Sequence, residues 1–274
     1  MISFPNAKIN LGLSVVHKRE DGYHDLETVF YPVPICDVLE IHRNDKGEVA
    51  LISSGIEVTD NVEDNLIVKA YRKLQQYHEL PGVDVYFKKQ IPFGAGLGGG
   101  SADASFMLLM LRDMFLPEVT DDQLEKYAAT IGADCAFFIK NKPVYAEGIG
   151  EVFSPISVSL KGYKLIIVKP DVHVSTKDAF GNIQVAKPEF GVKNVVENMP
   201  VEQWADRLKN DFEITVFAKH PLLGEIKQRL YDMGAVYASM TGSGASLYGV
   251  FKSEDEVDKN SFPDCFFWQG ECKY

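Results

Sequence analysis

The sequence predicts an α+β protein with two domains. At 274 residues, with 46% hydrophobic and 24% charged residues, the chain has room for one large domain or two modest ones. Segments with the two-residue period of strands and segments with the period of helices both recur along the chain. The residue pattern changes near Ser154-Pro155, and a new apolar strand is expected to begin at Tyr163. We therefore expect domains at residues 1–155 and 156–274.

The first domain is expected to begin with strands. Residues 5–16 alternate between apolar and small or polar side chains, with the apolar set facing a core. Lys8 and Asn10 therefore share the opposite face of this strand. A helix should run from an N-cap at Asp64 to about Tyr77. After a polar loop at residues 17–25, further strands are expected at residues 28–31, 37–42, 49–53 and 83–87.

Further along, a glycine-rich turn leads into a buried helix, and Thr120 and Gln123 form a capping box that starts another helix. Gly132 should end that helix, with strands following at residues 136–139 and 143–147. The second domain should contain a strand at residues 163–168 and a loop with a short helix at 180–200. An amphipathic helix at residues 222–233, closed by Gly234, precedes two strands around a glycine-rich turn.

Charge and cysteine content exclude several classes of protein. The formal net charge of −11 and pI near 5.1 argue against a nucleic-acid or membrane partner, because both would favour a basic surface. Four widely separated cysteines without C-x-x-C spacing fit reduced packing residues better than disulfides or a zinc site. The start of the chain has no apolar signal core. A cytoplasmic location is expected, and no segment indicates an obligate protein partner.

Residues 91–104 carry the strongest functional signal. They run from a strand into a helix through five glycines, with Lys88 and Lys89 just before them. Glycine lets backbone N–H groups approach a ligand closely, and the helix N-terminus carries partial positive charge. Phosphates bind well at such a turn. A purely structural turn is the alternative, but it would need roughly one or two glycines.

Two familiar phosphate loops do not fit this segment. A Walker loop requires Gly-Lys-Ser/Thr at its end, and no lysine lies between Gly94 and Ser101. Gly94, Gly96 and Gly99 match the G-x-G-x-x-G spacing of dinucleotide-binding proteins, but no acidic residue closes a second strand about twenty residues later. The loop therefore belongs to another class.

The pattern Pro-x-Gly-x-Gly-Leu-Gly-x-x-Ser-Ala resembles the ATP loop of the GHMP kinases, which include galactose, homoserine and mevalonate kinases. Three more segments are similar to this superfamily: residues 5–13, Gly132-Ala-Asp134, and Met240-Thr-Gly-Ser-Gly-Ala-Ser246. Together with Asp21-Gly-Tyr-His24, they resemble a branch that acts on a cytidine diphosphate-linked alcohol in the non-mevalonate route to isoprenoid precursors. The likeness extends from the N-terminus to about residue 250.

This resemblance implies the GHMP fold, with an N-terminal ATP-binding α/β domain and a ferredoxin-like α+β C-terminal domain. It also implies transfer of the ATP γ-phosphoryl group to a secondary hydroxyl, the 2-hydroxyl of that substrate, with Mg²⁺ as a second cofactor. We name no protein ligand for Mg²⁺, because phosphates and water supply most of its shell. The implied ATP contacts are Lys89, Pro92, Phe93, Gly94, Ala95, Gly96, Leu97, Gly98, Gly99, Gly100, Ser101, Ala102 and Asp103.

Lys8 and Asp134 are the implied catalytic pair. An aspartate can accept the hydroxyl proton while a lysine steadies the carboxylate and the developing phosphate charge. Asp134 also lies among apolar residues, where a carboxylate needs a cationic partner, and Lys8 is the candidate. Taken singly, Asp134 could instead cap the turn after Gly132, and Lys8 could be an exposed strand lysine.

The resemblance also implies contacts with the acceptor substrate. Tyr23, His24 and Phe180 would surround the cytosine, since aromatic faces stack pyrimidines well. Asn10 and Thr176 would reach other parts of the substrate. The alternatives are that Asp21-Gly22 is only a turn and that Phe180 only packs.

Two departures from the family pattern stand out. The chain has Cys135-Ala136 where relatives usually have Val-Pro, and Ser101-Ala-Asp103 where they usually have Ser-Ser-Asn or Ser-Ser-Asp.

Three alternative functions are considered. A homoserine kinase would not need the residue 21–24 segment or the Lys8 and Asp134 pair. A mevalonate-type kinase would keep the pair and lack the aromatic segment. A regulator that binds nucleotide without chemistry is the remaining alternative.

Overall fold

The computed structural model describes residues 1–56, 61–181, 183 and 185–273. It divides into two compact units. The first unit consists of Met1–Ala7, Ile35–Phe93 and Gly98–Lys142, and the second of Lys8–Pro34, Gly94–Leu97 and Pro143–Tyr274. Each unit thus uses several stretches of the chain. The boundary between residues 155 and 156 stays a prediction about sequence domains.

The first unit contains a four-stranded sheet in the order β1-β4-β6-β5. Its strands are β1 (Ile2–Ser3), β4 (Val38–Arg43), β5 (Val49–Gly55) and β6 (Val83–Lys89). β6 runs antiparallel to β4 and parallel to β5, so Ile41 and Leu51 both lie opposite Val85. Side chains in one such row point to the same face of a sheet. This row belongs to the core of the first unit.

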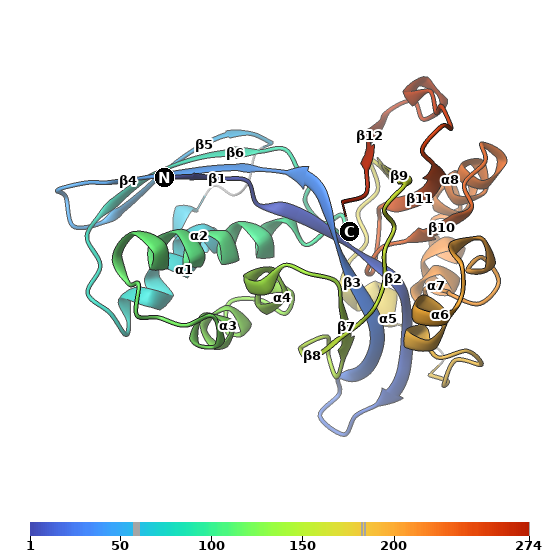
Figure 1. Ribbon diagram of the computed structural model, residues 1–274, viewed down its shortest axis with the longest axis horizontal. Helices are drawn as coiled ribbons and strands as arrows, with labels where there is room; N and C mark the ends of the chain where they lie inside the picture. Colours follow the sequence, from blue (N-terminus) through green and yellow to red (C-terminus); the bar gives the residue numbers. More distant parts are fainter. Residues whose placement is uncertain (57–60, 182, 184, 274) are drawn as a thin grey trace. The chain divides into compact units, whose positions relative to one another are not determined.

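Two helices cover that face of the sheet, α1 (Leu66–Gln75) and α2 (Gly99–Phe115) (Figure 1). Their buried stripes join the sheet in one apolar cluster. The predicted N-cap of α1 is wrong by one residue. Asn65 accepts a hydrogen bond from the Ile67 N–H at 2.9 Å, while Asp64 belongs to the short 3-10 helix η1 (Val62–Asp64). Either residue type can cap a helix, so the sequence alone did not separate them.

The first unit also contains α3 (Asp121–Ala129) and α4 (Cys135–Lys140). The capping box of α3 is confirmed, since Thr120 and Gln123 exchange both of its hydrogen bonds. The strand predicted at residues 136–139 is wrong, because these residues lie within α4. A short apolar run has no periodicity that distinguishes a buried strand from a buried helix. Asn141, with φ of 51°, ends this helix in a left-handed conformation.

A second sheet has the order β2-β3-β7-β8 and lies mostly in the second unit. Its strands are β2 (Asn6–Lys18), β3 (His24–Cys36), β7 (Val144–Glu147) and β8 (Val152–Pro155). β2 was expected to bury one face. It is instead buried on both faces between Ala7 and Val15, with Lys8 only 3% exposed. The polar side chains on this strand therefore need partners inside the protein.

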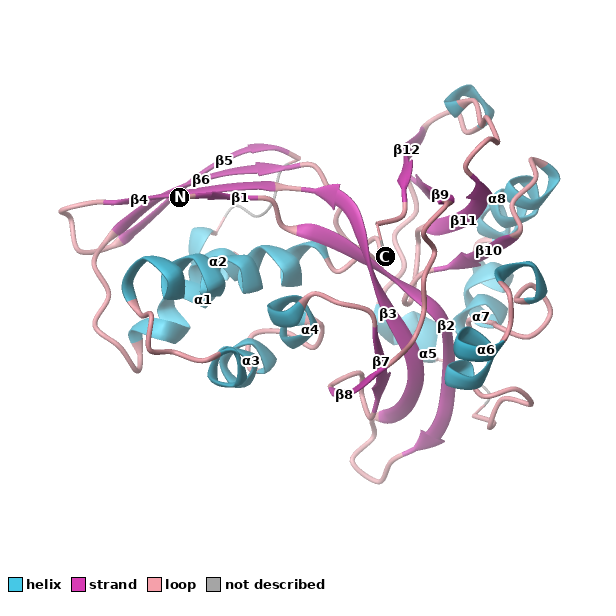
Figure 2. Cartoon of the chain, in the orientation of Figure 1, coloured by secondary structure: helices cyan, strands magenta, loops and turns pink. Residues whose placement is uncertain are grey.

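The third sheet is antiparallel, in the order β10-β11-β9-β12. Figure 2 shows α7 and α8 beside it, and an apolar cluster joins them. The remaining elements of the second unit are β9 (Tyr163–Pro170), α5 (Thr176–Phe180), α6 (Val192–Asn198), η2 (Val201–Gln203), α7 (Phe212–Lys219), α8 (Pro221–Asp232), β10 (Tyr237–Met240), β11 (Leu247–Lys252), η3 (Lys259–Ser261) and β12 (Cys265–Glu271). The predicted helix stop at Gly234 is confirmed, with φ of 101° at that glycine.

The described residues also include a short helix after residue 190 and free cysteines. Within the described part of residues 180–200, α6 is the short helix expected there. All four cysteines have free thiols. Among the described residues, no helix combines the length and the apolar character needed to cross a membrane.

Candidate active site

The glycine loop precedes α2, the longest helix in the described chain. Gly94, Gly96 and Gly98 all have positive φ, at 56°, 71° and 69°. Residues with side chains rarely adopt this conformation, so these glycines shape the turn. The first turn of α2 contains no acidic residue. Its free N–H groups and helix dipole therefore favour an anion at this end.

Close packing explains two of the glycines. A Cβ atom on Gly96 would lie 2.1 Å from the Thr241 carbonyl oxygen. The loop backbone can therefore approach Thr241 this closely only because residue 96 is glycine. A Cβ atom on Gly99 would lie 2.9 Å from Ile91 Cγ2 and 3.0 Å from Lys89 Nζ. The loop is thus fitted against its surroundings at both positions.

Lys89 ends β6 and lies inside an ion cluster. Its Nζ donates to Asp37 Oδ2 at 2.6 Å and to Asp103 Oδ2 at 2.7 Å, and its side chain is fully buried. Asp37 Oδ1 accepts the backbone N–H groups of Gln90 at 2.5 Å and Ile91 at 2.8 Å. The cluster joins the end of β6, the start of the glycine segment and the second turn of α2. Contact of the Lys89 and Asp103 side chains with ATP stays a prediction.

Asp103 is the carboxylate of this cluster whose hydrogen bonding is incomplete. Its Oδ1 is buried and has no hydrogen-bond partner among the described residues. Burial raises the pKa of Asp103 well above its ordinary value, Asp37 adds to the rise, and Lys89 opposes it. A site with two carboxylates and one ammonium holds one negative charge more than it can pair. Burial and the neighbouring Asp37 thus favour the neutral form of the Asp103 carboxyl more than water does.

Sequence reasoning missed Asp37. Its signal is a single charged residue in the otherwise apolar stretch of residues 29–39. A buried carboxylate in such a stretch requires donors, and here two backbone N–H groups and Lys89 supply them. Only the fold reveals which donors those are.

Lys8 is a buried residue of β2, not an exposed strand lysine. Its Nζ donates to Asn10 Oδ1 at 2.7 Å and lies 4.8 Å from the centre of the Phe30 ring. Its backbone N–H donates to the Leu97 carbonyl at 2.9 Å, which ties β2 directly to the glycine loop. The ammonium is therefore held by Asn10, and the strand that carries it is hydrogen-bonded to the glycine loop. This is what a positioned catalytic cation requires.

Asn10 is enclosed in the same network. It is 2% exposed, and its Nδ2 donates to Thr28 Oγ1 at 3.0 Å. Thr28, which sequence reasoning missed, in turn donates to the Gly12 carbonyl at 2.5 Å. The Asn10 side chain is thus bonded within the protein, and its contact with substrate stays a prediction.

Asp134 lies just before α4, in the first unit. It occupies the N-cap position, but its side chain makes no capping hydrogen bond. The alternative role as a helix cap is therefore wrong, and the carboxylate is directed to other interactions. Lys8 belongs to the second unit, so the pairing of Lys8 with Asp134 stays a prediction.

Two of the predicted aromatic residues meet. The rings of His24 and Phe180 stack with centroids 4.9 Å apart and an interplanar angle of 22°. Phe180 also contacts Phe212 edge-on at 4.7 Å. A base between two rings needs about 7 Å between them, twice the usual contact distance. A cytosine would therefore stack on an outer face of the pair or separate the rings.

Tyr23 and Thr176 flank these rings along the chain. Tyr23 is 61% exposed at the end of a turn, where its N–H donates to Asp21 Oδ1 at 3.0 Å. Asp21 thus acts in turn formation, as the sequence suggested. Thr176 is exposed at the first position of α5, next to the N-cap Ser175. Both side chains are accessible, and their contact with substrate stays a prediction.

The C-terminal glycine motif, residues 240–246, is held by side chains that sequence reasoning missed. Asn210 Nδ2 donates to the carbonyls of Met240 at 2.7 Å and Gly242 at 2.9 Å. Glu213 accepts the Met240 N–H at 2.8 Å. Glu213 lies in the first turn of α7, which the sequence did not predict, and Asn210 lies two residues before that helix. The motif backbone is therefore fixed from outside its own segment.

Comparison with known proteins supports the same reading. Residues 65–142 match the GHMP kinases N terminal domain, and residues 193–259 match the GHMP kinases C terminal family. A 4-diphosphocytidyl-2-C-methyl-D-erythritol kinase of Bacteroides fragilis strain YCH46 is 54% identical over 275 residues, with all of both chains covered. One from Bacteroides thetaiotaomicron is also 54% identical, with 97% of this chain and 98% of that protein covered.

This chain belongs to the GHMP kinases. A crystal structure of 4-(cytidine 5'-diphospho)-2C-methyl-D-erythritol kinase matches it with a TM-score of 0.83 and 29% identity, covering 99% of each chain. The mevalonate kinase of Methanococcus jannaschii matches with a TM-score of 0.75 at 13% identity, which shows the shared fold alone. The predicted α+β GHMP fold is confirmed, and the chain is an ATP-dependent small-molecule kinase.

The two departures from the GHMP pattern have distinct surroundings. Cys135 is buried, and burial raises the pKa of its thiol to about 11, so it is not a reactive thiolate near neutral pH. Ser105 Oγ donates to the carbonyls of Cys135 at 2.7 Å and Ser101 at 2.8 Å, which joins the first turns of α4 and α2. Ala102, which stands where the second serine is usual, is fully buried in the first turn of α2.

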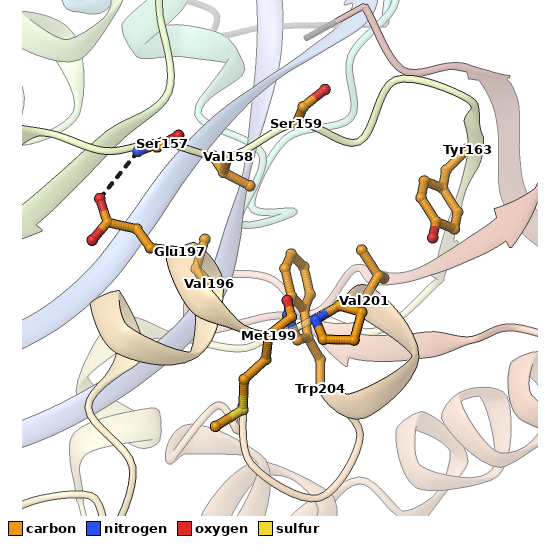
Figure 3. Close-up of a pocket in the computed structure, with 10 residues that line it drawn as sticks. Ser157, Val158, Ser159, Tyr163, Val196, Glu197, Met199, Val201 and Trp204 are labelled. Atoms are coloured by element: carbon orange, nitrogen blue, oxygen red, sulfur yellow. Dashed lines mark hydrogen bonds between the residues drawn. The ribbon is translucent and has the colours of Figure 1, made fainter.

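The GHMP kinase chain has a further pocket in its second unit (Figure 3). Ser157, Tyr163, Glu197 and Trp204 are among its lining residues, and the Ser157 N–H donates to Glu197 Oε1 at 3.1 Å. No residue of the predicted site lines it. The pocket therefore adds nothing to the assignment of ATP or substrate contacts.

Proposed function

We propose that this GHMP kinase transfers the γ-phosphoryl group of ATP to the 2-hydroxyl of 4-diphosphocytidyl-2-C-methyl-D-erythritol, in the non-mevalonate route to isoprenoid precursors. The observation that carries the proposal is the full-length identity of 54% to a kinase named for this substrate. The matched region contains the glycine loop, Lys8, Asp134 and the His24 segment. We also expect a cytoplasmic location.

Carbon 2 of this substrate carries the methyl group of its name, so its hydroxyl is tertiary. The expectation of a secondary hydroxyl is therefore wrong for this position. A tertiary hydroxyl is crowded and is a slow nucleophile unless it is well oriented. Positioning and proton removal thus become the main tasks of the protein.

We assign the proton transfer to Asp134. As the acceptor oxygen bonds to the γ-phosphorus, its proton passes to the Asp134 carboxylate, and the bond from the γ-phosphorus to the β–γ bridging oxygen breaks to release ADP. The buried Lys8 ammonium supplies positive charge for the carboxylate and the transferring phosphoryl group.

We assign ATP phosphate binding to residues 92–103, with Mg²⁺ bound to the nucleotide. The described residues contain no group of three or more histidine, cysteine or acidic side chains that could hold a metal. Phosphate oxygens and water supply most of the Mg²⁺ shell, and the Ser101 hydroxyl in the first turn of α2 is a candidate protein donor. When bound, Mg²⁺ neutralises phosphate charge.

ADP release tests this proposal. Purified protein with Mg²⁺ and ATP should release ADP when 4-diphosphocytidyl-2-C-methyl-D-erythritol is added, and mevalonate or homoserine should be poor acceptors. Equal or better turnover with either of those would overturn the substrate assignment and leave the superfamily intact. No acceptor-dependent ADP at all would favour a regulator that binds nucleotide without chemistry.

A further inference from the structure

The hydroxyl of Thr241 joins three segments that are far apart in the sequence. Its Oγ1 lies 3.1 Å from the Asn10 backbone nitrogen, 3.2 Å from Asn10 Oδ1 and 3.1 Å from the Gly96 carbonyl oxygen. Asn10 belongs to β2, Gly96 to the glycine loop and Thr241 to the C-terminal glycine motif. All three residues lie in the second unit.

One hydrogen must serve two acceptors at this point. The Thr241 oxygen accepts the Asn10 backbone N–H, and its own single hydrogen can be donated to Asn10 Oδ1 or to the Gly96 carbonyl. Asn10 Oδ1 also accepts the Lys8 ammonium at 2.7 Å. The bond that Thr241 makes therefore affects both the glycine loop and the acceptor that holds Lys8.

Neighbouring contacts leave little freedom in this network. Tyr248 OH donates to the Asn10 carbonyl at 2.7 Å, and Thr28 accepts from Asn10 Nδ2. Asn10 and Thr241 are 2% and 0% exposed, so water cannot replace a lost partner. Gly96 approaches Thr241 so closely that only glycine fits.

We propose that Thr241 and Asn10 are positioning residues that couple the seating of the glycine loop to the orientation of the Lys8 ammonium. The inference rests on the proposed function, because that function makes Lys8 catalytic. Phosphate groups that accept hydrogen bonds from the loop backbone shift the Gly96 carbonyl. The hydrogen bond of the Thr241 hydroxyl transmits this shift to Asn10 Oδ1. Lys8 is thereby oriented when ATP is bound.

Thr241→Val tests the coupling, because valine keeps the shape and removes the hydroxyl. We expect kcat to fall about tenfold and KM for ATP to rise about threefold or more, as for the loss of a buried hydrogen bond. Thr241→Ser keeps the hydroxyl and should stay within about threefold of the parent for both constants. Thr241→Ala, which removes the hydroxyl and leaves space, replaces the valine variant if that protein does not fold.

Thr28→Val is the matched control. Thr28 is buried and bonds the Asn10 side chain, but no hydrogen bond links it to the glycine loop among the described residues. It should lower kcat and leave KM for ATP unchanged. A rise in KM for ATP as large as that of Thr241→Val would show a general loss of structure and overturn the coupling.

A double-mutant cycle with Lys8→Ala gives the decisive readout. If Thr241 acts through Lys8, Thr241→Val should change kcat by less than about twofold in the Lys8→Ala background. A full tenfold loss in that background would overturn the inference. A parent protein that does not turn over the cytidine substrate contradicts the proposed function instead. In that event, weaker binding of an ATP analogue by Thr241→Val still supports the loop contact, and unchanged binding overturns it.

Discussion

At the scale of single residues, the site depends on charged groups that the fold has withdrawn from water. Lys8 and Lys89 are both almost fully buried, and each is held by oxygen acceptors at 2.6–2.7 Å. Their roles differ. The Lys89 ammonium donates to two carboxylates, whereas the Lys8 ammonium donates to the neutral amide oxygen of Asn10.

Substitution of the proposed catalytic pair should mainly affect kcat. Asp134→Asn removes the proton acceptor with little change in volume, so kcat should fall by roughly two to four orders of magnitude while ATP still binds. Lys8→Ala should lower kcat by a comparable factor. The double variant should lose much less kcat than the product of the two losses. Steady-state kinetics and ATP-analogue binding measure both effects. Near-normal kcat for Asp134→Asn would exclude the general-base role.

Asp103→Asn should stabilise the protein near neutral pH. The folded-state pKa of Asp103 lies above its unfolded value of about 3.9, so its contribution to stability is complete below that value and is lost as the pH rises through the folded pKa. Asparagine cannot ionise and avoids this loss. We expect a gain on the order of 1 kcal/mol in the free energy of unfolding at pH 8, which shrinks towards pH 4.

Asp37→Ala is the control for this measurement, since it lies in the same cluster and should act in the opposite direction. It leaves two backbone N–H groups without their acceptor and should lower the melting temperature at both pH values. A destabilised Asp103→Asn at pH 8 would mean that the charged carboxylate is needed there.

At the scale of elements, the proposed site depends on the positions of glycines in the loop before α2 and on the stacked rings of His24 and Phe180. The loop before α2 contains three glycines in the left-handed conformation, and the first N–H groups of a long helix follow it. His24 enters β3 directly after a tight turn, and Phe180 ends α5. The glycine loop, His24 and Phe180 thus lie at the ends of elements, whereas Lys8 and Asn10 lie within β2.

Gly96→Ala should disable the loop. The new Cβ would lie 2.1 Å from the Thr241 carbonyl oxygen, and φ of 71° is unfavourable for alanine. We expect kcat/KM for ATP to fall at least about tenfold, because a shift of the loop by a fraction of an ångström misplaces the phosphates. Gly224→Ala in α8 is the matched control, with ordinary contact at 3.5 Å from Phe217. It should leave ATP kinetics unchanged.

Loss of the His24 ring should weaken binding of the cytidine substrate. His24→Ala should weaken binding of that substrate by about 1–3 kcal/mol, which raises its KM, with little change in KM for ATP. Phe180→Ala should show the same change together with a lower melting temperature, because Phe180 also packs on Phe212. Both KM values and the melting temperature are needed for each variant. An unaltered cytidine-substrate KM would remove that ring from the base site.

The same scale shows how far the sequence could predict the fold. Strong periodicity predicted α8, β2 and β6, and the capping box predicted α3. The six-residue α4 was read as a strand because its run of apolar residues carries no period. The glycine loop was found from its five glycines, and Lys8, Asp134 and His24 were found through the resemblance to the GHMP kinases. Asp37, Thr28 and Asn210 were not, since isolated polar residues acquire partners only through long-range contacts.

At the scale of the whole molecule, the two compact units are each assembled from separate stretches of chain. Lys8, His24 and Gly94–Leu97 belong to the second unit, while Asp134 and Gly98–Asp103 belong to the first. The residues proposed for substrate and phosphate binding thus come from both units. The family match over the full chain fits this division, because both units must be present for the proposed reaction.

The central claim is that the phosphoryl group moves from ATP to the 2-hydroxyl of 4-diphosphocytidyl-2-C-methyl-D-erythritol. Phosphorus NMR of the purified protein with Mg²⁺, ATP and this substrate tests it most directly. The claim predicts one new phosphomonoester signal that grows in step with ADP, with the cytidine diphosphate signals retained and the ester carried on carbon 2. Release of ADP with inorganic phosphate and no new ester, or an ester on another carbon, would contradict it.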